Sequence, residues 1–293
     1  MLSLITVVHR PEIPYIKIQA QSIQQYFDSD YIQSIHVVVN DDDSVCDLID
    51  KSWYGDLVDR VNITPRSIYG YRDRVNGWDS QQLLKLLTAS KVRTDWSMVL
   101  DAKTFFVKQC TPDLLFLGDK ALINSLEPFP EFNSSKQCVE QLFKLVLDKI
   151  VGPGGVPFLF HTDTVRSLIT DIEIMTRTTF SNWFQTNVRH PIFLTEFFLY
   201  SGYVKYKHGN LRELYTPGQK WDCVNLADWQ IDKFNEIYDE MRLFKTLTVS
   251  IQARAWPSLT DEQKLKYVTL LKTKNIVDDI DSTLEQLNTV IIN

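Results

Sequence analysis

The sequence predicts an α/β fold built on a mixed, mainly parallel sheet flanked by helices. An apolar, β-branched run over residues 2–8 is followed by helical spacing over 13–26 and by a second such run over 34–39. Strand, helix and strand within this short span are typical of a βαβ unit, whose two strands are parallel. A further apolar run over 97–100 ends at Asp101 and predicts another buried strand.

The pattern of strands and helices continues until the character of the chain changes near residue 221. The remaining predicted elements are strands at 57–63 and 158–160 and helices at 80–91, 139–151, 162–175 and 195–203. From residue 221 onward apolar residues recur mostly at helical spacing, with one strand expected at 247–253. We therefore expect a sheet domain over residues 1–220 and a mainly helical C-terminal extension over 221–293 packed on it.

The composition limits the class of function. The 293 residues carry a net charge of −6, and 44% of them are apolar and 12% aromatic, which is enough for a sizeable core. The mild acidity argues against nucleic-acid binding, which needs a concentrated basic face. No apolar stretch reaches the length of a membrane-spanning helix, so no transmembrane segment is expected. The four cysteines are scattered without a metal-site spacing, which indicates reduced thiols and a cytoplasmic protein.

A charged pair lies where the predicted strand at 97–100 ends. Asp101 and Lys103 are separated by one small residue, and a second apolar run follows at 104–107. Ligands of open α/β sheets bind beyond the carboxyl ends of the strands. The pair is therefore expected to face a ligand, and the alternative is a surface salt bridge that only caps the strand.

Five pieces of sequence in a fixed order carry a family resemblance: the βαβ start, GWDSQQLLKLLTAS, DWSMVLDAK, GPGGVPFLFHTDTV and TEFFLYSGYV. Over residues 1–215 the chain resembles bacterial and viral glycosyltransferases of the GT-A fold. It is most similar to a poorly characterised family that reads G-W-x-x-Q-Q-x-x-K-L before V-L-D-x-D. The resemblance implies a nucleotide-sugar donor, with a UDP-sugar as the first expectation, and a carbohydrate, lipid-linked or small-molecule acceptor. It also implies an Asp-x-Asp motif that binds a divalent metal on the diphosphate.

This chain departs from that motif, because Asp101-Ala102-Lys103 has an ammonium where the second carboxylate belongs. A lysine repels a dication, but its own charge can stabilise the negative charge that grows on a departing diphosphate. At about 4 Å and an effective dielectric near 20, one such charge contributes roughly 4 kcal/mol. We therefore expect a metal-independent glycosyltransferase in which Lys103 replaces the metal. Mn²⁺ or Mg²⁺ at Asp101 is expected only if the altered motif still binds metal.

Other positions are expected to surround the donor and the acceptor. The donor-side candidates, at strand ends, in the loop over 67–79 and on the helix after it, are His9, Arg10, Asn40, Asp41, Arg72, Trp78, Gln82 and Lys85. The acceptor-side candidates, in and after the glycine-rich turn, are Gly154, Gly155, His161 and Asp163. Glu196 is the expected catalytic general base, because its aromatic neighbours would make the carboxylate more basic.

Two alternatives stay open. A catalytically inactive GT-A-like module that binds or scaffolds would tolerate the Asp-x-Lys departure. A nucleotidyltransferase would share the sheet and the nucleotide, but it usually has a glycine-rich phosphate loop after the first strand, and residues 9–12 contain no glycine. Release of nucleoside diphosphate from a donor separates an enzyme from the inactive module.

Overall fold

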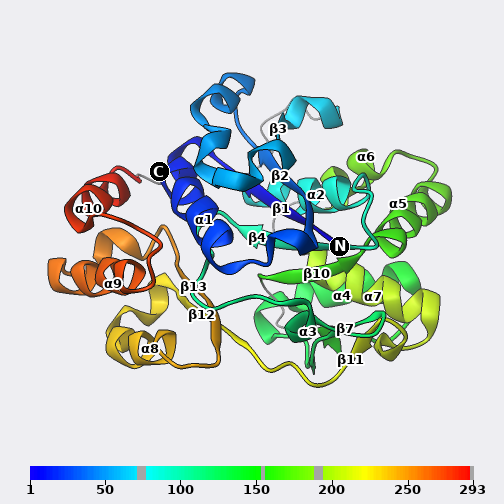
Figure 1. The fold of residues 1–293 in the computed structure, drawn as a ribbon. Helices are drawn as coiled ribbons and strands as arrows, with labels where there is room; N and C mark the ends of the chain where they lie inside the picture. The colour runs from blue at the N-terminus through cyan, green and yellow to red at the C-terminus, as the bar shows by residue number, and fades with distance from the viewer. Residues whose placement is uncertain (71–76, 153–155, 188–193, 291–293) are drawn as a thin grey trace.

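The computed structural model describes residues 1–70, 77–152, 156–187 and 194–290, and it contains a five-stranded sheet (Figure 1). The first four of its strands in sequence are parallel, and the fifth runs antiparallel to β4 at one edge. In spatial order the strands are β10 (Phe158–His161), β4 (Trp96–Asp101), β1 (Leu2–Val8), β2 (Ile32–Val39) and β3 (Val61–Pro65).

Helices cover both faces of this sheet. Thr6 and Val7 are neighbours on β1 and therefore point to opposite faces. Thr6 donates a hydrogen bond to Gln19 of α1 (2.8 Å), whereas Val7 packs against Leu84 of α2. The helices are α1 (Ile13–Tyr26), α2 (Gly77–Ala89), α3 (Pro112–Leu115), α4 (Asn133–Phe143), α5 (Thr162–Thr176), α6 (Phe180–Asn187), α7 (Glu196–His208), α8 (Phe234–Met241), α9 (Asp261–Thr273) and α10 (Ile280–Asn288). The predicted mixed, mainly parallel sheet flanked by helices is confirmed.

The central strand fixes where a ligand site can lie. Every residue of β1 is buried, as expected for a strand with parallel neighbours and with helices on both faces. Val7 of β1 is the register partner of Asp101 of β4, so both strands end at the same edge of the sheet. This carboxyl edge is where ligands bind in open α/β sheets.

The C-terminal segment supplies strands as well as helices. After Asp101 the chain leaves the main sheet, and β5 (Phe105–Phe106) pairs antiparallel with β13 (Thr246–Ile251), which is parallel to β12 (Asp222–Leu226). The remaining strands are β6 (Phe116–Leu117), β7 (Lys120–Leu122) and β11 (Tyr215–Thr216) in one small sheet, and β8 (Ser125–Leu126) and β9 (Ile150–Val151) in another. Within the described residues no helix has the length and apolar character needed to cross a membrane.

Two predicted elements have other bounds in the structure. The helix predicted at 139–151 is α4, which ends at Phe143, because Lys144 adopts a left-handed conformation (φ 53°) and stops the helix. The strand predicted at 57–63 is β3, which begins only at Val61. The residues before it, Lys51–Arg60, form a 3₁₀ segment whose Leu57 is buried, so an apolar residue that suggested a strand packs from a helical turn instead.

Close packing of α4 on α7 requires glycine at position 202. A Cβ atom added to Gly202 would lie 2.1 Å from Val139 Cγ1 of α4. Helix propensity alone would favour alanine there by about 1 kcal/mol, but overpacking costs about 1–3 kcal/mol. Gly202→Ala is therefore expected to lower the free energy of unfolding in urea denaturation. The double variant Gly202→Ala/Val139→Ala should be more stable than Gly202→Ala alone, and a stabilised Gly202→Ala would contradict this packing.

Candidate functional site

Asp101 and Lys103 flank a turn between β4 and β5 at the carboxyl edge of the main sheet. The N–H of Thr104 donates to the carbonyl of Asp101 (2.9 Å). Gln19, a buried residue of α1, donates its side-chain amide to the carbonyls of Asp101 (2.7 Å) and Thr104 (3.1 Å). Thr6 of β1 in turn donates to Oε1 of Gln19. The backbone that carries the two charged side chains is therefore fastened to β1 and α1.

Four charged side chains meet at this turn and form what we call the charged cluster: Lys85, Asp101, Lys103 and Glu196. Lys85 Nζ lies 3.1 Å from Asp101 Oδ1 and 3.0 Å from Glu196 Oε1. Lys103 Nζ lies 3.0 Å from the other oxygen of Asp101, Oδ2. With two ammonium groups and two carboxylates, the charged cluster is formally neutral.

The members of the charged cluster differ in their access to solvent. Lys85, from the middle of α2, is 3% exposed, and Glu196, the first residue of α7, is 0% exposed. Asp101 and Lys103 are 21% and 18% exposed. The ammonium of Lys85 also lies 5.4 Å from the ring centroid of Phe197. Lys85 and Glu196 therefore form the buried end of the cluster, and Asp101 and Lys103 form its solvent-facing end.

Charged partners and burial together shift the pKa values of three of these groups. Burial alone would lower the pKa of Lys85, but the carboxylates of Asp101 and Glu196 outweigh burial and raise that pKa above the ordinary lysine value. Burial alone would raise the pKa of Asp101, but Lys103 and Lys85 hold it below the ordinary aspartate range. For Glu196 burial outweighs the attraction of Lys85, so its pKa is raised. Lys85 and Asp101 are therefore firmly charged at neutral pH, and Glu196 is the weaker acid of the two carboxyls.

Acid is expected to remove the stability that Asp101 contributes. A carboxyl whose pKa is lowered on folding contributes stability above its unfolded pKa, about 3.9 for aspartate, and loses that contribution as the pH falls. The difference in free energy of unfolding between the wild type and Asp101→Asn should therefore be present at pH 7 and shrink below about pH 4. Urea denaturation across this pH range measures the difference, and a difference independent of pH would contradict the ion pairs.

The donor set at Asp101 does not fit a divalent metal. Mg²⁺ and Mn²⁺ need several oxygen ligands. Here each oxygen of Asp101 is already in contact with a lysine ammonium, and the second position of the motif is itself a lysine. A dication at this position would face two positive charges at close range.

The donor-side candidates that follow β1 and β2 lie side by side, and the amide of Asn40 joins them. Asn40 is 2% exposed, and its Nδ2 donates to Ser80 Oγ (2.8 Å) and to the carbonyl of Gly77 (3.1 Å) and lies 3.3 Å from His9 Nε2. A Cβ on Gly77 would lie 2.8 Å from His9 Cε1, so the start of α2 approaches His9 closely. Asn40 thus binds protein groups and fastens α2 to the carboxyl edge.

Arg10 and Asp41, which follow His9 and Asn40 in the sequence, are more open to solvent than Asn40. Arg10 is exposed, and its N–H donates to Asp41 Oδ2 (3.3 Å). The N–H groups of Asp42 and Arg10 outweigh the effect of burial and lower the pKa of Asp41. The half-buried His9 and the exposed Arg10 therefore lie at the carboxyl edge, where the sequence predicts donor contacts.

Three of the candidates on and before α2 lie within the described residues: Trp78, Gln82 and Lys85. Gln82 is buried, and its amide donates to the carbonyl of Trp78 in the preceding turn (3.2 Å). Trp78 is partly buried in the first turn of α2. Lys85 joins the charged cluster instead of an open donor surface. Arg72 lies outside the described residues.

Two of the acceptor-side candidates, His161 and Asp163, are not brought to the charged cluster. Because β10 is antiparallel to β4, His161 is the register partner of Trp96, at the amino end of β4 and opposite Asp101. His161 Nδ1 contacts Thr164 Oγ1 (3.0 Å), and Asp163 forms an ion pair with Arg166 (2.7 Å). Gly154 and Gly155 lie outside the described residues. The physical reason for the separation is strand direction, which the sequence did not reveal.

Glu196 is buried in this structure, and Gln19 is a further residue of the candidate site. A general base must contact the acceptor hydroxyl, but both carboxylate oxygens of Glu196 are inaccessible to solvent, and Oε2 has no hydrogen-bond partner among the described residues. Its observed contact is the ammonium of Lys85.

Gln19 is a residue of the candidate site that the sequence did not predict. The available signal was a glutamine on the buried stripe of α1, between Ile16 and Ile23.

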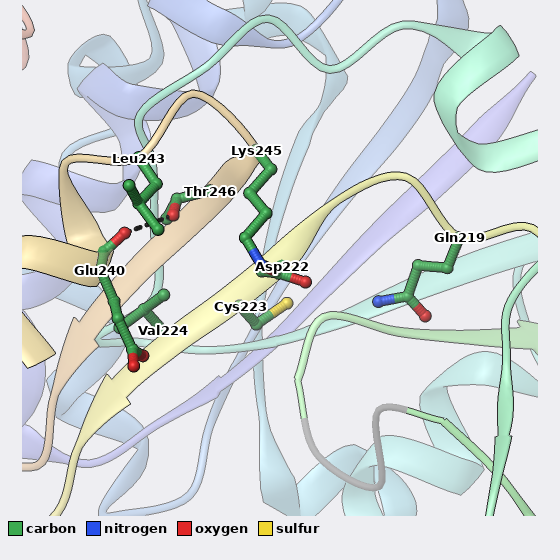
Figure 2. Close-up of a pocket in the computed structure, with 8 residues that line it drawn as sticks. All are labelled: Gln219, Asp222, Cys223, Val224, Glu240, Leu243, Lys245 and Thr246. Atoms are coloured by element: carbon green, nitrogen blue, oxygen red, sulfur yellow. Dashed lines mark hydrogen bonds and ion pairs between the residues drawn. The ribbon is translucent and has the colours of Figure 1, made fainter.

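A cavity of about 340 Å³ lies away from the charged cluster, where β12 and β13 begin (Figure 2). Its lining includes Gln219, Cys223 and an exposed ion pair between Lys245 and Asp222 (2.6 Å). The antiparallel pairing of β5 with β13 places these residues near the end of β5, whereas Lys103 precedes its start. The cavity is therefore separate from the carboxyl edge.

Two solved glycosyltransferase structures are similar to this chain at low sequence identity. The galactosyltransferase LgtC, solved in complex with donor and acceptor sugar analogs, is similar at 10% identity and a TM-score of 0.48, over 94% of this chain and 98% of that chain. The apo-form glycosyltransferase GlyE from Streptococcus pneumoniae TIGR4 is similar at 12% identity and a TM-score of 0.46, over 97% of this chain and 62% of that chain. The comparison with curated proteins finds no match. A model described as "Family of unknown function (DUF6492)" matches residues 3–266, and the chain belongs to this family.

Proposed function

We propose that this protein is a glycosyltransferase that uses a nucleotide-sugar donor, with a UDP-sugar expected first, and that it works without a divalent metal. The observation that carries the proposal is the Asp101-Ala102-Lys103 turn at the carboxyl edge of a parallel sheet. Its ammonium is partly exposed, and both oxygens of its carboxylate are paired with lysines. The family resemblance of the sequence supports the same class of reaction.

The chemistry of the reaction explains why an ammonium suits this position. Transfer breaks the bond between the anomeric carbon and the diphosphate, and the electron pair of that bond leaves with the diphosphate. Stabilising this developing charge lowers the barrier. Lys103 is the catalytic residue of the proposal, because its Nζ would contact the departing oxygens as a point charge. His9 and Arg10, which follow the end of β1 and precede α1, are the proposed donor contacts.

Gln19 and the other three members of the charged cluster act through Lys103. Gln19 holds the turn, and Asp101 holds the lysine side chain near the edge in the absence of donor. Lys85 compensates the charge of Asp101, and Glu196 compensates that of Lys85. We assign these four side chains a positioning role. Glu196 acts as a counter-ion to Lys85, because its carboxylate is buried and does not reach the solvent-exposed space in which an acceptor would bind.

A non-catalytic module that binds nucleotide-sugars is the second candidate. The neutrality of the charged cluster favours it, because every ammonium already has a carboxylate partner and the arrangement is stable without substrate. Such a module would bind a donor but release no nucleoside diphosphate from it. Incubation of the protein with donor, followed by measurement of free nucleoside diphosphate, separates the two candidates.

A thermal-shift screen tests the proposed donor class. The protein is heated with UDP-, GDP-, CMP- and dTDP-sugars, each with Mn²⁺ and with EDTA. A ligand that binds the native state at about 100 times its Kd stabilises it by about 2.7 kcal/mol. We expect one donor class to raise Tm equally in Mn²⁺ and in EDTA. No shift with any donor would contradict the proposal, and a shift confined to Mn²⁺ would contradict its metal-independent part.

A further inference from the structure

The two lysines of the charged cluster are held in different ways. Lys85 is 3% exposed and lies between two carboxylates, Asp101 and Glu196. Lys103 is 18% exposed, and within the described part of the chain its ion pair is with Asp101 alone. Lys103 can therefore exchange its partner by side-chain rotation. Lys85 cannot move away without leaving the buried carboxylate of Glu196 unpaired.

We propose that the carboxylate of Asp101 is a built-in competitor of the donor diphosphate for Lys103, and that donor binding displaces it. The inference rests on the proposed function, since it names the ligand as a nucleoside diphosphate. Without donor, Asp101 Oδ2 occupies the ammonium. With donor, the ammonium turns to the diphosphate, and Asp101 keeps its second partner, Lys85.

The contacts around Asp101 keep the free-energy cost of this exchange low. A buried carboxylate that loses its only partner is strongly destabilising, but Lys85 remains 3.1 Å from Asp101 Oδ1 when Lys103 departs. Glu196 holds Lys85 from the other side. The backbone need not move, because Gln19 is bonded to the carbonyls of Asp101 and Thr104. A diphosphate carries more negative charge than one carboxylate, so it attracts the ammonium more strongly.

The proposal predicts an effect of opposite sign to that of a metal ligand. Asp101→Asn removes the competing charge and also a repulsion on the diphosphate. Titration calorimetry of UDP in EDTA should then show binding up to about fivefold tighter than to the wild type, the gain expected from freeing one partly exposed ion pair. If Asp101 instead held a metal on the diphosphate, Asp101→Asn would weaken binding. Equal or weaker binding overturns the proposal.

Two further variants sharpen the titration. Lys103→Met should weaken UDP binding, and adding Asp101→Asn to it should tighten binding less than Asp101→Asn does in the wild type, because only the repulsion of the diphosphate is then relieved and no ammonium is freed. Asp222→Asn is the matched control, since Asp222 forms an ion pair with Lys245 away from the carboxyl edge; its UDP affinity should equal that of the wild type. If UDP, GDP, CDP and dTDP all fail to bind the wild type, the proposed function fails first and this inference fails with it.

A measurement on the wild-type protein covers the case in which Asp101→Asn does not fold. Lysines labelled with ¹³C at Cε are observed by NMR, and the Lys103 signal is identified by its absence in Lys103→Arg. Addition of UDP should shift this signal, while the signal of Lys85, identified in the same way with Lys85→Arg, stays in place. An unshifted Lys103 signal at saturating UDP overturns the exchange.

Discussion

Replacing Lys103 by alanine will lower the rate of nucleoside diphosphate release from the donor by about 10²- to 10³-fold. The size follows from a charge of roughly 4 kcal/mol at about 4 Å and an effective dielectric near 20, with each ~1.4 kcal/mol worth a factor of ten in rate. The loss should fall mainly on kcat, because the charge that Lys103 stabilises grows in the transition state. Steady-state kinetics with the donor identified in the thermal-shift screen measure it.

Two variants separate this effect from a general loss of positive charge. Lys103→Arg keeps the charge on a bulkier planar group and is expected to retain part of the rate. Lys108 lies near the other end of β5, where its ammonium is 4.3 Å from the ring centroid of Phe244. Lys108→Ala should leave the rate unchanged. Equal rates in Lys103→Ala and the wild type would remove the catalytic role from Lys103.

Replacing Lys85 by methionine will destabilise the fold by about 3–5 kcal/mol, the range measured when one partner of a buried ion pair is removed. The cause is Glu196, which is 0% exposed and would be left as a buried carboxylate without its counter-ion. Methionine keeps most of the aliphatic volume of lysine, so the effect reports the charge and not a cavity. Urea denaturation of the variant and the wild type measures the change.

Removing both charges is expected to restore part of this stability. In Lys85→Met/Glu196→Gln the buried carboxylate is gone, and Asp101 keeps Lys103 as a partner. The double variant should therefore be more stable than Lys85→Met alone, which is the sign of direct coupling in a double-mutant cycle. Lys266→Met is the matched control, because its ion pair with Glu262 (2.9 Å) is exposed and should contribute less than about 1 kcal/mol. Simple additivity would show that Lys85 and Glu196 do not interact.

The parts of the fold that follow from short-range periodicity were predicted closely. The strand over 2–8 and the helix over 13–26 have the predicted bounds, because a β-branched run and a helical apolar stripe each depend on neighbouring residues only. The break at Asp101 was predicted for the same reason. The helix predicted over 139–151 was too long, since the left-handed conformation of Lys144 is not encoded in apolar spacing.

The parts of the site that depend on long-range geometry were harder to predict. The sequence indicated that Lys85 and Asp101 matter, but not that one ammonium joins residues 101 and 196, because that contact requires α2, β4 and α7 to be assembled. The direction of β10, which carries His161 to the opposite end of β4, is a property of the sheet and not of the segment. Gln19 was overlooked because its partners are backbone carbonyls 82 and 85 residues away.

Metal dependence of the reaction tests the role of Lys103 most directly. The protein is stripped of metal, and release of nucleoside diphosphate from the donor is measured in EDTA and then in Mn²⁺. Lys103 in place of the second carboxylate predicts equal rates under the two conditions for the wild type. A wild-type rate that is lost in EDTA and restored by Mn²⁺ would contradict the proposal that an ammonium replaces the metal.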